Sequence, residues 1–109
     1  RTATKKYPRV AIIVPCWNEE DTISATANSL LALDYPKDRL SIVLVNDGST
    51  DMTAKIMTRF SKNPQITVIH KKNGGKHTAL NSGIKAVPDA EFIGCLDADS
   101  FVEPDSLRE

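Results

Sequence analysis

Short, mostly apolar runs recur four times along the chain, and segments with turn or helical patterns separate them. The first run, RVAIIVP, is β-branched and continuously apolar at its centre, which is typical of a strand covered on both faces. The later runs SIVLVND, ITVIH and AEFIGCLD have a similar character. The pattern therefore predicts four strands, at residues 9–15, 41–47, 66–70 and 90–97.

Between these strands the apolar residues follow the 3.6-residue period of a helix. The positions expected to face the sheet are Ile23, Ala27, Leu30 and Leu31 in the first helix, Thr53, Ile56, Met57 and Phe60 in the second, and Leu80, Ile84 and Val87 in the third. Asn18 is the expected N-cap of the first helix, with acidic residues in its first turn, and Pro36 lies just beyond its end.

The alternation of strands and helices predicts an α/β domain with a parallel sheet, right-handed crossovers and helices on both faces. In such sheets the binding and catalytic residues lie beyond the carboxyl ends of the strands, where the strand order reverses. The predicted strands end in polar, charged or glycine residues, namely PCWNE, NDGS, HKK followed by NGGK, and DAD. This distribution predicts a functional site at that edge of the sheet.

The charge balance excludes some classes of partner. The chain has 14 Lys plus Arg and 14 Asp plus Glu, so no net field attracts nucleic acid or an anionic membrane. No apolar run approaches the roughly 20 residues that a membrane span needs, and no signal peptide is visible. We therefore expect no nucleic-acid partner and no membrane span within these residues.

The length of 109 residues suits one small domain. The polar start, RTATKKYPRV, and the abrupt end at DSLRE suggest a piece of a longer protein, with residues 1–9 as an N-terminal extension and 10–109 as the domain. Two cysteines are too few for a disulfide scaffold. Because Cys16 and Cys95 each end an apolar run, we expect buried free thiols in a reducing compartment.

The apolar run FIGCL leads directly into two aspartates, Asp97 and Asp99. In an extended chain, residues two apart point the same way, and two like charges so close call for a cation. A hard divalent ion such as Mg²⁺ or Mn²⁺ prefers one or two carboxylates together with the oxygens of a diphosphate. The alternative is that Asp99 or Ser100 caps a turn before a further helix at EPDSLRE.

The segment NGGKHTALN places two glycines and Lys76 at the entrance to a predicted helix. Free backbone N–H groups and the helix dipole favour an anion there, and the lysine adds a full charge. The alternative is a glycine turn with a solvated lysine. The spacing is not that of a P-loop.

Two further residues at strand ends suit a nucleoside. Asp47 could accept a hydrogen bond from a base N–H or a ribose hydroxyl, or it could form a local turn or cap the second helix. Trp17, the single tryptophan, could stack on a nucleobase or cover the edge of the sheet.

The ordered motifs VPCWNEE, VNDGSTD, NGGKHTALNSG and LDADS resemble the nucleotide-binding half of the family 2 glycosyltransferases, most closely the cellulose-synthase-like branch. The resemblance runs from about Val10 to the last residue. It implies the Rossmann-like, three-layer α/β sandwich of the nucleotide-binding half of a GT-A fold. It also implies a UDP-sugar donor, a divalent metal (Mg²⁺ or Mn²⁺), and a parent protein attached to the membrane with this domain on the cytoplasmic side.

The same resemblance assigns roles to seven residues. Asp47 would contact the uracil, Trp17 would pack on it with Pro15 alongside, and Lys76 would approach the diphosphate. Asp97 would lie near the ribose and sugar, Asp99 would bind the metal, and Glu19 belongs to the same nucleotide-sugar site through its place in the first motif.

The sequence departs from the family pattern in three respects. Asn46 stands where many relatives have aspartate, and Trp17 stands where the motif usually has tyrosine. The downstream Thr-Glu-Asp-like motif with the catalytic base, and the Gln-x-x-Arg-Trp motif of processive members, are both absent. We therefore expect the donor half of an inverting transferase that extends a polysaccharide or another acceptor, without turnover of its own and with the saccharide acceptor bound elsewhere.

Two other functions are compatible with parts of the pattern. A flavodoxin-like phospho-acceptor domain also has aspartates at strand ends, but here Glu19, Glu20, Asp97 and Lys76 occur in the wrong strand order for it. A non-catalytic module that self-associates through an apolar sheet edge is the other alternative.

Overall fold

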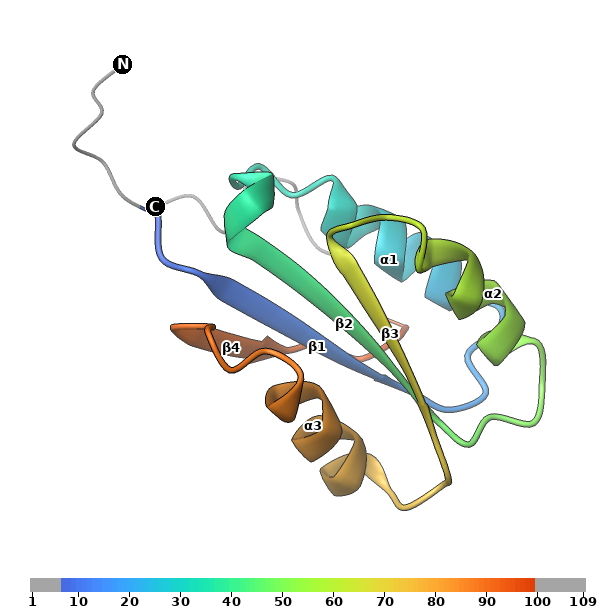
Figure 1. The fold of residues 1–109 in the computed structure, drawn as a ribbon. Coiled ribbons are helices and arrows are strands. Elements are labelled where there is room, and N and C mark those ends of the chain that lie inside the picture. The colour runs from blue at the N-terminus through green and yellow to red at the C-terminus, as the bar shows by residue number, and fades with distance from the viewer. Residues whose placement is uncertain (1–6, 100–109) are drawn as a thin grey trace.

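The computed structural model describes residues 7–99, which form one parallel four-stranded sheet in the order β3-β2-β1-β4 (Figure 1). The strands are β1 (Val10–Cys16), β2 (Leu40–Asp47), β3 (Ile66–Lys71) and β4 (Phe92–Cys95). The helices are α1 (Ile23–Leu31), α2 (Thr53–Phe60) and α3 (Lys76–Lys85), with a 3-10 turn, η1, at Lys37–Arg39. The predicted α/β class with four parallel strands is confirmed, although β4 is shorter than expected.

Helices α1 and α2 cover one face of the sheet and α3 covers the other, so the domain has three layers (Figure 1). The chain adds β2 and β3 on one side of β1 and then returns to add β4 on its other side. The strand order therefore reverses between β1 and β4. Ligands of open α/β sheets bind beyond the carboxyl ends of the strands at such a point.

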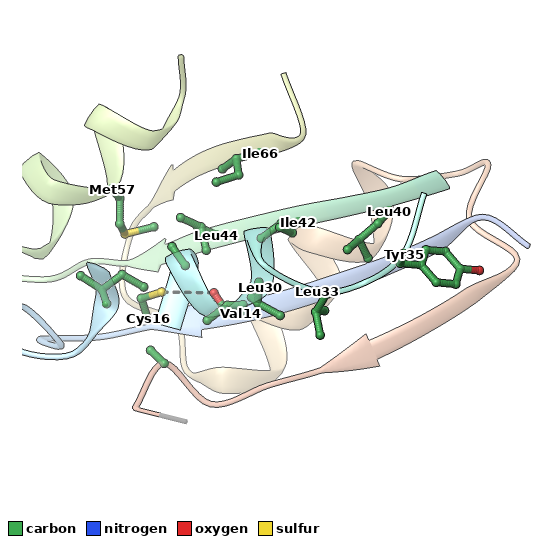
Figure 2. Packing of buried hydrophobic residues seen from close by; sticks show 13 residues of the cluster. Val14, Cys16, Leu30, Leu33, Tyr35, Leu40, Ile42, Leu44, Met57 and Ile66 are labelled. Carbon is green, nitrogen blue, oxygen red and sulfur yellow. Dashed lines mark hydrogen bonds between the residues drawn. The ribbon is translucent and has the colours of Figure 1, made fainter. Parts of the chain in front are cut away.

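The larger part of the core lies between α1, α2 and the sheet (Figure 2). Successive strand residues point to opposite faces. Thus Ile42 and Leu44 of β2 pack in the cluster under α1 and α2, whereas Val43 and Val45 pack against α3. Because both faces of β2 are covered, its continuous apolar run is explained by the fold.

Helix α3 approaches the sheet closely because small residues face it. Ala79 and Gly83 are buried, and a Cβ atom on Gly83 would lie only 2.5 Å from Ile13 Cγ2. Leu80 and Val87 pack at the margin of this contact, as predicted. Ile84 was expected to face inward and is instead 43% exposed, because the contact runs through the small residues on another side of the helix.

The start of α1 differs from the prediction. The helix begins at Ile23 after Thr22, no acidic residue lies in its first turn, and Leu31 is only partly buried. Asn18 is not its N-cap. It has a left-handed backbone (φ 52°), and its side chain accepts a hydrogen bond from the Thr50 N–H at 2.8 Å. The connection after β1 is therefore tied to the connection after β2.

The two thiols have different environments. Cys16 is buried, as predicted, and its Sγ donates a hydrogen bond to the Val14 carbonyl (Figure 2). Cys95 is exposed, so its predicted burial is wrong. The reason is that β4 pairs with β1 alone in the described chain and lies at the edge of the sheet, where Phe92 and Ile93 are also exposed.

At the other end of the strands, Tyr7 packs edge-to-face on Tyr35, with 5.2 Å between the ring centroids. The Tyr35 hydroxyl donates a hydrogen bond to the Pro8 carbonyl at 2.6 Å. The last residues of the expected N-terminal extension therefore pack on the domain. The rest of that extension, Ser100 and the helix expected at EPDSLRE lie outside the described residues. Within residues 7–99 no helix has the length and apolar character to cross a bilayer.

Candidate functional site

A pocket of about 280 Å³ opens at the carboxyl ends of β1, β2 and β4, beside the start of α3. It is lined by Pro15, Trp17, Glu19, Asp47, Lys76, Asp97, Ala98 and Asp99. These include all seven residues that the sequence assigned to a site, and the structure brings them together from positions up to 84 residues apart in the chain. The location agrees with the point where the strand order reverses.

A larger hollow of about 530 Å³ lies at the opposite, amino end of the sheet, between the segments that precede β2 and β3. Its lining residues are Leu31, Lys37, Asp38, Asn63, Pro64 and Gln65. None of these residues was predicted from the sequence to belong to a functional site, and they include one cation and one carboxylate. Pocket volume alone therefore does not indicate which of the two hollows is the functional site. The polar and charged residues that converge in the smaller one favour it.

Asp47 is the most constrained polar group of the pocket, with 5% of its surface exposed. Its Oδ1 accepts hydrogen bonds from Lys71 Nζ at 2.7 Å and from the Gly74 N–H at 2.9 Å, and its Oδ2 accepts one from the Gly75 N–H at 3.0 Å. Burial by itself raises the pKa of this carboxyl, but these hydrogen bonds outweigh it and hold the pKa below the ordinary value of 3.8. Asp47 is therefore an ionised acceptor.

These bonds correct one expectation for the glycine turn before α3. The sequence predicted free N–H groups there, ready to bind an outside anion. The structure shows that the N–H groups of Gly74 and Gly75 already bind an anion, which is the Asp47 carboxylate. Gly75 adopts the left-handed region (φ 96°) that lets the turn present both groups to Asp47. In this structure the charge left for a phosphate at the turn is that of Lys76.

Lys76 donates a hydrogen bond to Asp97 Oδ1 at 2.8 Å, which joins the start of α3 to the segment after β4. The hydrogen bond to Asp97 raises the pKa of the Lys76 ammonium above its ordinary value. Both side chains are well exposed, so the pair is weak and either group can change partner at small cost. Asp99, also exposed, lies on the far side of Ala98.

The acidic pair is anchored through the residue between its members. Ala98 is buried, and its carbonyl accepts a 2.6 Å hydrogen bond from the Thr26 hydroxyl on α1. Asp97 and Asp99, on either side of Ala98, both line the pocket and are exposed. Among residues 7–99 no group of three or more His, Cys, Asp or Glu side chains is arranged to hold a metal ion. A cation at this pair would need further ligands from a substrate or from water.

Trp17 follows β1 and is 52% exposed at the wall of the pocket, next to Pro15. The free surface of the indole is large enough for a ring to stack on it. The indole presents an aromatic surface to the pocket.

The wall that carries Glu19 is held by reciprocal hydrogen bonds between two loops. The Glu19 N–H donates to Thr53 Oγ1 at 2.8 Å, and the Asn18 N–H donates to Ser49 Oγ at 3.0 Å. In the other direction, the Met52 N–H donates to Glu20 Oε1 at 2.9 Å. This explains the polar sequence of both loops: their side chains satisfy the backbone of the neighbouring loop.

Asn46 and His70, at the ends of β2 and β3, form a contact next to the site that the sequence did not predict. Asn46 Oδ1 accepts from the Ser49 N–H at 2.9 Å, so its Nδ2 faces His70 Nδ1 at 3.1 Å and donates to it. The Asn46 amide accepts from Ser49 and donates to His70, whereas an aspartate at this position could not donate a hydrogen bond. Lys71 and Thr26 were missed for a similar reason. No local pattern marks a lysine or a threonine whose partner lies 24 or 72 residues away.

Known proteins with a similar sequence or fold were found by comparison. The model of the family described as Glycosyl transferase family 2 matches residues 11–109. The poly-beta-1,6-N-acetyl-D-glucosamine synthase of Staphylococcus epidermidis is 39% identical over 98 residues, which cover 89% of this chain and 23% of that protein. The chain thus spans about a quarter of the length of the curated relatives it matches.

Two solved structures resemble the domain closely. S. aureus TarS 1-349 in complex with UDP has a TM-score of 0.82 at 28% identity, with 92% of this chain and 30% of that chain covered. The mannosyltransferase PcManGT from Pyrobaculum calidifontis, in complex with GDP-Man and Mn²⁺, has a TM-score of 0.81 at 32% identity, with 88% and 29% covered.

Proposed function

The chain belongs to glycosyl transferase family 2, and we propose that it forms the donor-binding part of an enzyme that transfers a sugar from a UDP-sugar to an acceptor hydroxyl. The observation that carries the proposal is the composition of the pocket at the carboxyl ends of β1, β2 and β4. One hollow combines an exposed aromatic ring, a buried ionised carboxylate, a lysine and an acidic pair. These groups match the base, the diphosphate and the sugar of such a donor.

The nucleobase would lie between the carboxyl ends of β1 and β2. The Trp17 ring offers a surface for stacking on uracil, with Pro15 alongside, and Asp47 offers an acceptor for the ring N–H. A carboxylate that is already ionised needs no proton loss before it accepts that bond. Glu19 completes this wall of the pocket.

The diphosphate would lie beside Lys76. In this proposal the ammonium turns from Asp97 to the phosphate oxygens, and the released carboxylate accepts a hydrogen bond from a ribose or sugar hydroxyl. The exchange is inexpensive because the Lys76–Asp97 pair is exposed. The two side chains thus lie where we expect the diphosphate and the sugar of the donor to bind.

The acidic pair fits a divalent cation of the Mg²⁺ or Mn²⁺ type. Both side chains offer carboxylate oxygens, which are the ligands these ions prefer, and two carboxylates suit an ion that shares a diphosphate. We expect Asp99 to hold it, with Asp97 adjacent. When bound, such an ion supplies neutralisation of charge on the diphosphate leaving group.

The reaction that we propose for the whole enzyme is inverting transfer, in which an acceptor hydroxyl attacks the anomeric carbon while UDP departs. The motif expected to carry the base is absent from this sequence, so we expect the chain alone to bind the donor without turnover. The similarity to poly-beta-1,6-N-acetyl-D-glucosamine synthases, and to TarS in complex with UDP-GlcNAc, makes N-acetylglucosamine the first sugar to test. By the same similarity, the acceptor would be a growing polysaccharide.

Calorimetric titration of UDP and UDP-N-acetylglucosamine into the chain, with and without Mn²⁺, tests the proposal. We expect binding that Mn²⁺ strengthens, and that Asp99→Asn makes insensitive to Mn²⁺. Asp89→Asn, an exposed carboxylate outside the pocket, is the matched control and should behave like the parent chain. Absence of nucleotide binding by folded chain, in both conditions, would contradict the proposal.

The phospho-acceptor alternative gains no support from the family match. Self-association does have an observation in its favour, since Phe92 and Ile93 are exposed on the edge strand β4. Sedimentation velocity over a range of concentrations tests it. A monomer at all concentrations would dismiss it, and a dimer that Phe92→Ser dissociates would support it.

A further inference from the structure

Lys71, at the end of β3, is connected more fully than any other lysine for which the described part of the chain shows hydrogen bonds. Its Nζ donates to Asp47 Oδ1 at 2.7 Å, to the Lys72 carbonyl at 2.6 Å and to Thr78 Oγ1 at 2.8 Å. An ammonium group has three N–H donors, so all of them are used. Only 18% of this side chain is exposed, whereas the adjacent Lys72 is exposed.

The three acceptors belong to three different parts of the site. Asp47 ends β2, the Lys72 carbonyl begins the loop that contains the glycine turn, and Thr78 lies in the first turn of α3. The loop packs directly against this junction, because a Cβ atom on Gly74 would lie 2.7 Å from Thr78 Oγ1 and 3.1 Å from Lys71 Nζ. One ammonium therefore sets the positions of Asp47 and of the turn that leads to Lys76.

The hydrogen bonds at this junction also determine how many acceptor positions of the Asp47 carboxylate remain for a ligand. An ionised carboxylate has about four acceptor positions. Lys71 and Gly74 use two on Oδ1, and Gly75 uses one on Oδ2. A single position on Oδ2 is left, and Asp47 lines the pocket.

We infer that Lys71 is a positioning residue for nucleobase selection: by clamping Asp47 it leaves one fixed acceptor, which favours bases with a ring N–H over bases whose ring nitrogen is itself an acceptor. The inference rests on the proposed nucleotide site and deepens it. Uracil presents such an N–H group, as does guanine. Cytosine presents a lone pair at the equivalent nitrogen, so two acceptors would face each other.

Removal of Lys71 would weaken this selection for a physical reason. Without the ammonium, Asp47 loses one of the two partners of Oδ1 and the positive charge beside it, so the pKa of the buried carboxyl should rise. A protonated carboxyl can donate to cytosine, and a carboxylate held only by the Gly74 and Gly75 N–H groups has two open acceptor positions in place of one. The affinity for UDP should fall while that for CDP changes little.

The experiment compares UDP and CDP binding to the chain by calorimetry in the presence of Mn²⁺. The parent chain should prefer UDP, and Lys71→Met should reduce the UDP-to-CDP affinity ratio roughly tenfold, the usual range for a lost charged hydrogen bond. Lys71→Arg, which retains the charge, should restore part of the ratio. Lys72→Met removes the same charge one residue away and should leave the ratio within about twofold of the parent.

A second variant covers the case in which Lys71→Met does not fold. Thr78→Val removes one acceptor of Lys71 from an exposed helix position, and it should reduce the ratio by a smaller factor, while Thr78→Ser should not. An unchanged ratio in folded Lys71→Met or in Thr78→Val, or an equal loss in Lys72→Met, would overturn the inference while the nucleotide site stands. Binding of neither nucleotide by the parent chain would overturn the proposed function itself, and the inference with it.

Discussion

The hydroxyl of Thr26 donates a 2.6 Å hydrogen bond to the carbonyl of Ala98, and both residues are buried. This contact joins α1 to the segment that presents Asp97 and Asp99, 72 residues further along the chain. The acidic pair extends beyond the end of β4, where no strand pairing holds it. The position of the pair therefore depends on a side chain of the neighbouring helix.

Thr26→Val should lower the free energy of unfolding by about 1–3 kcal/mol, because it leaves the buried Ala98 carbonyl without this donor. It should also weaken the effect of Mn²⁺ on UDP binding, since the acidic pair loses its anchor. Urea denaturation and calorimetry measure the two effects. Thr26→Ser retains the hydroxyl and is the control. Equal losses in the two variants would show that the methyl group, and not the hydrogen bond, is what matters.

Gly83→Ala should destabilise the domain although alanine is the better helix former. A Cβ atom at this position would lie 2.5 Å from Ile13 Cγ2, so the helix or the strand must shift, at a cost of about 1–3 kcal/mol. The gain in helix propensity, about 1 kcal/mol, offsets only part of that. Asn81→Ala, at an exposed position of α3, is the control and should be neutral or stabilising. A thermal shift upward in both variants would refute the close packing.

The two cysteines should react at very different rates. Burial, and to a smaller extent the charge of Glu19, raises the pKa of the Cys16 thiol to about 12, so almost no thiolate forms at pH 8. Cys95 is exposed. A disulfide reagent such as DTNB should therefore modify one thiol rapidly in the native chain and two in urea. Cys95→Ser should abolish the rapid phase, and a rapid phase that persists would mean that Cys16 is accessible.

The pH dependence of stability should report the Asp47 carboxylate. Its pKa in the folded chain is lower than the ordinary value of 3.8, so its contribution is complete above that value and is lost as the pH falls through the folded pKa. Asp47→Asn should cost roughly 2–4 kcal/mol at neutral pH, less than for a fully buried pair because Lys71 is partly exposed. This difference should shrink below about pH 4. Urea unfolding between pH 3 and 7 measures it, and a constant difference would argue against the clamped carboxylate.

The local pattern of apolar residues was enough to predict much of the fold. Short apolar runs that suit buried strands, and the 3.6-residue apolar period of helices, located four strands and three helices from the sequence. The same patterns placed Met57 and Ile23 in the core correctly. These patterns failed where contacts with neighbouring elements decide whether a residue is buried. Ile84 is exposed because α3 contacts the sheet through Gly83, and Cys95 is exposed because β4 is an edge strand.

The site shows the same division between local chemistry and long-range contact. The sequence by itself determined which residues gather in the pocket, because a parallel sheet places the residues after every strand at one edge. Only the tertiary structure decided which contacts within the chain hold these residues in place. The glycine turn holds Asp47, Lys71 neutralises it, and Thr26 anchors the acidic pair. Such contacts depend on distances between segments far apart in the chain, and no local pattern of residues encodes those distances.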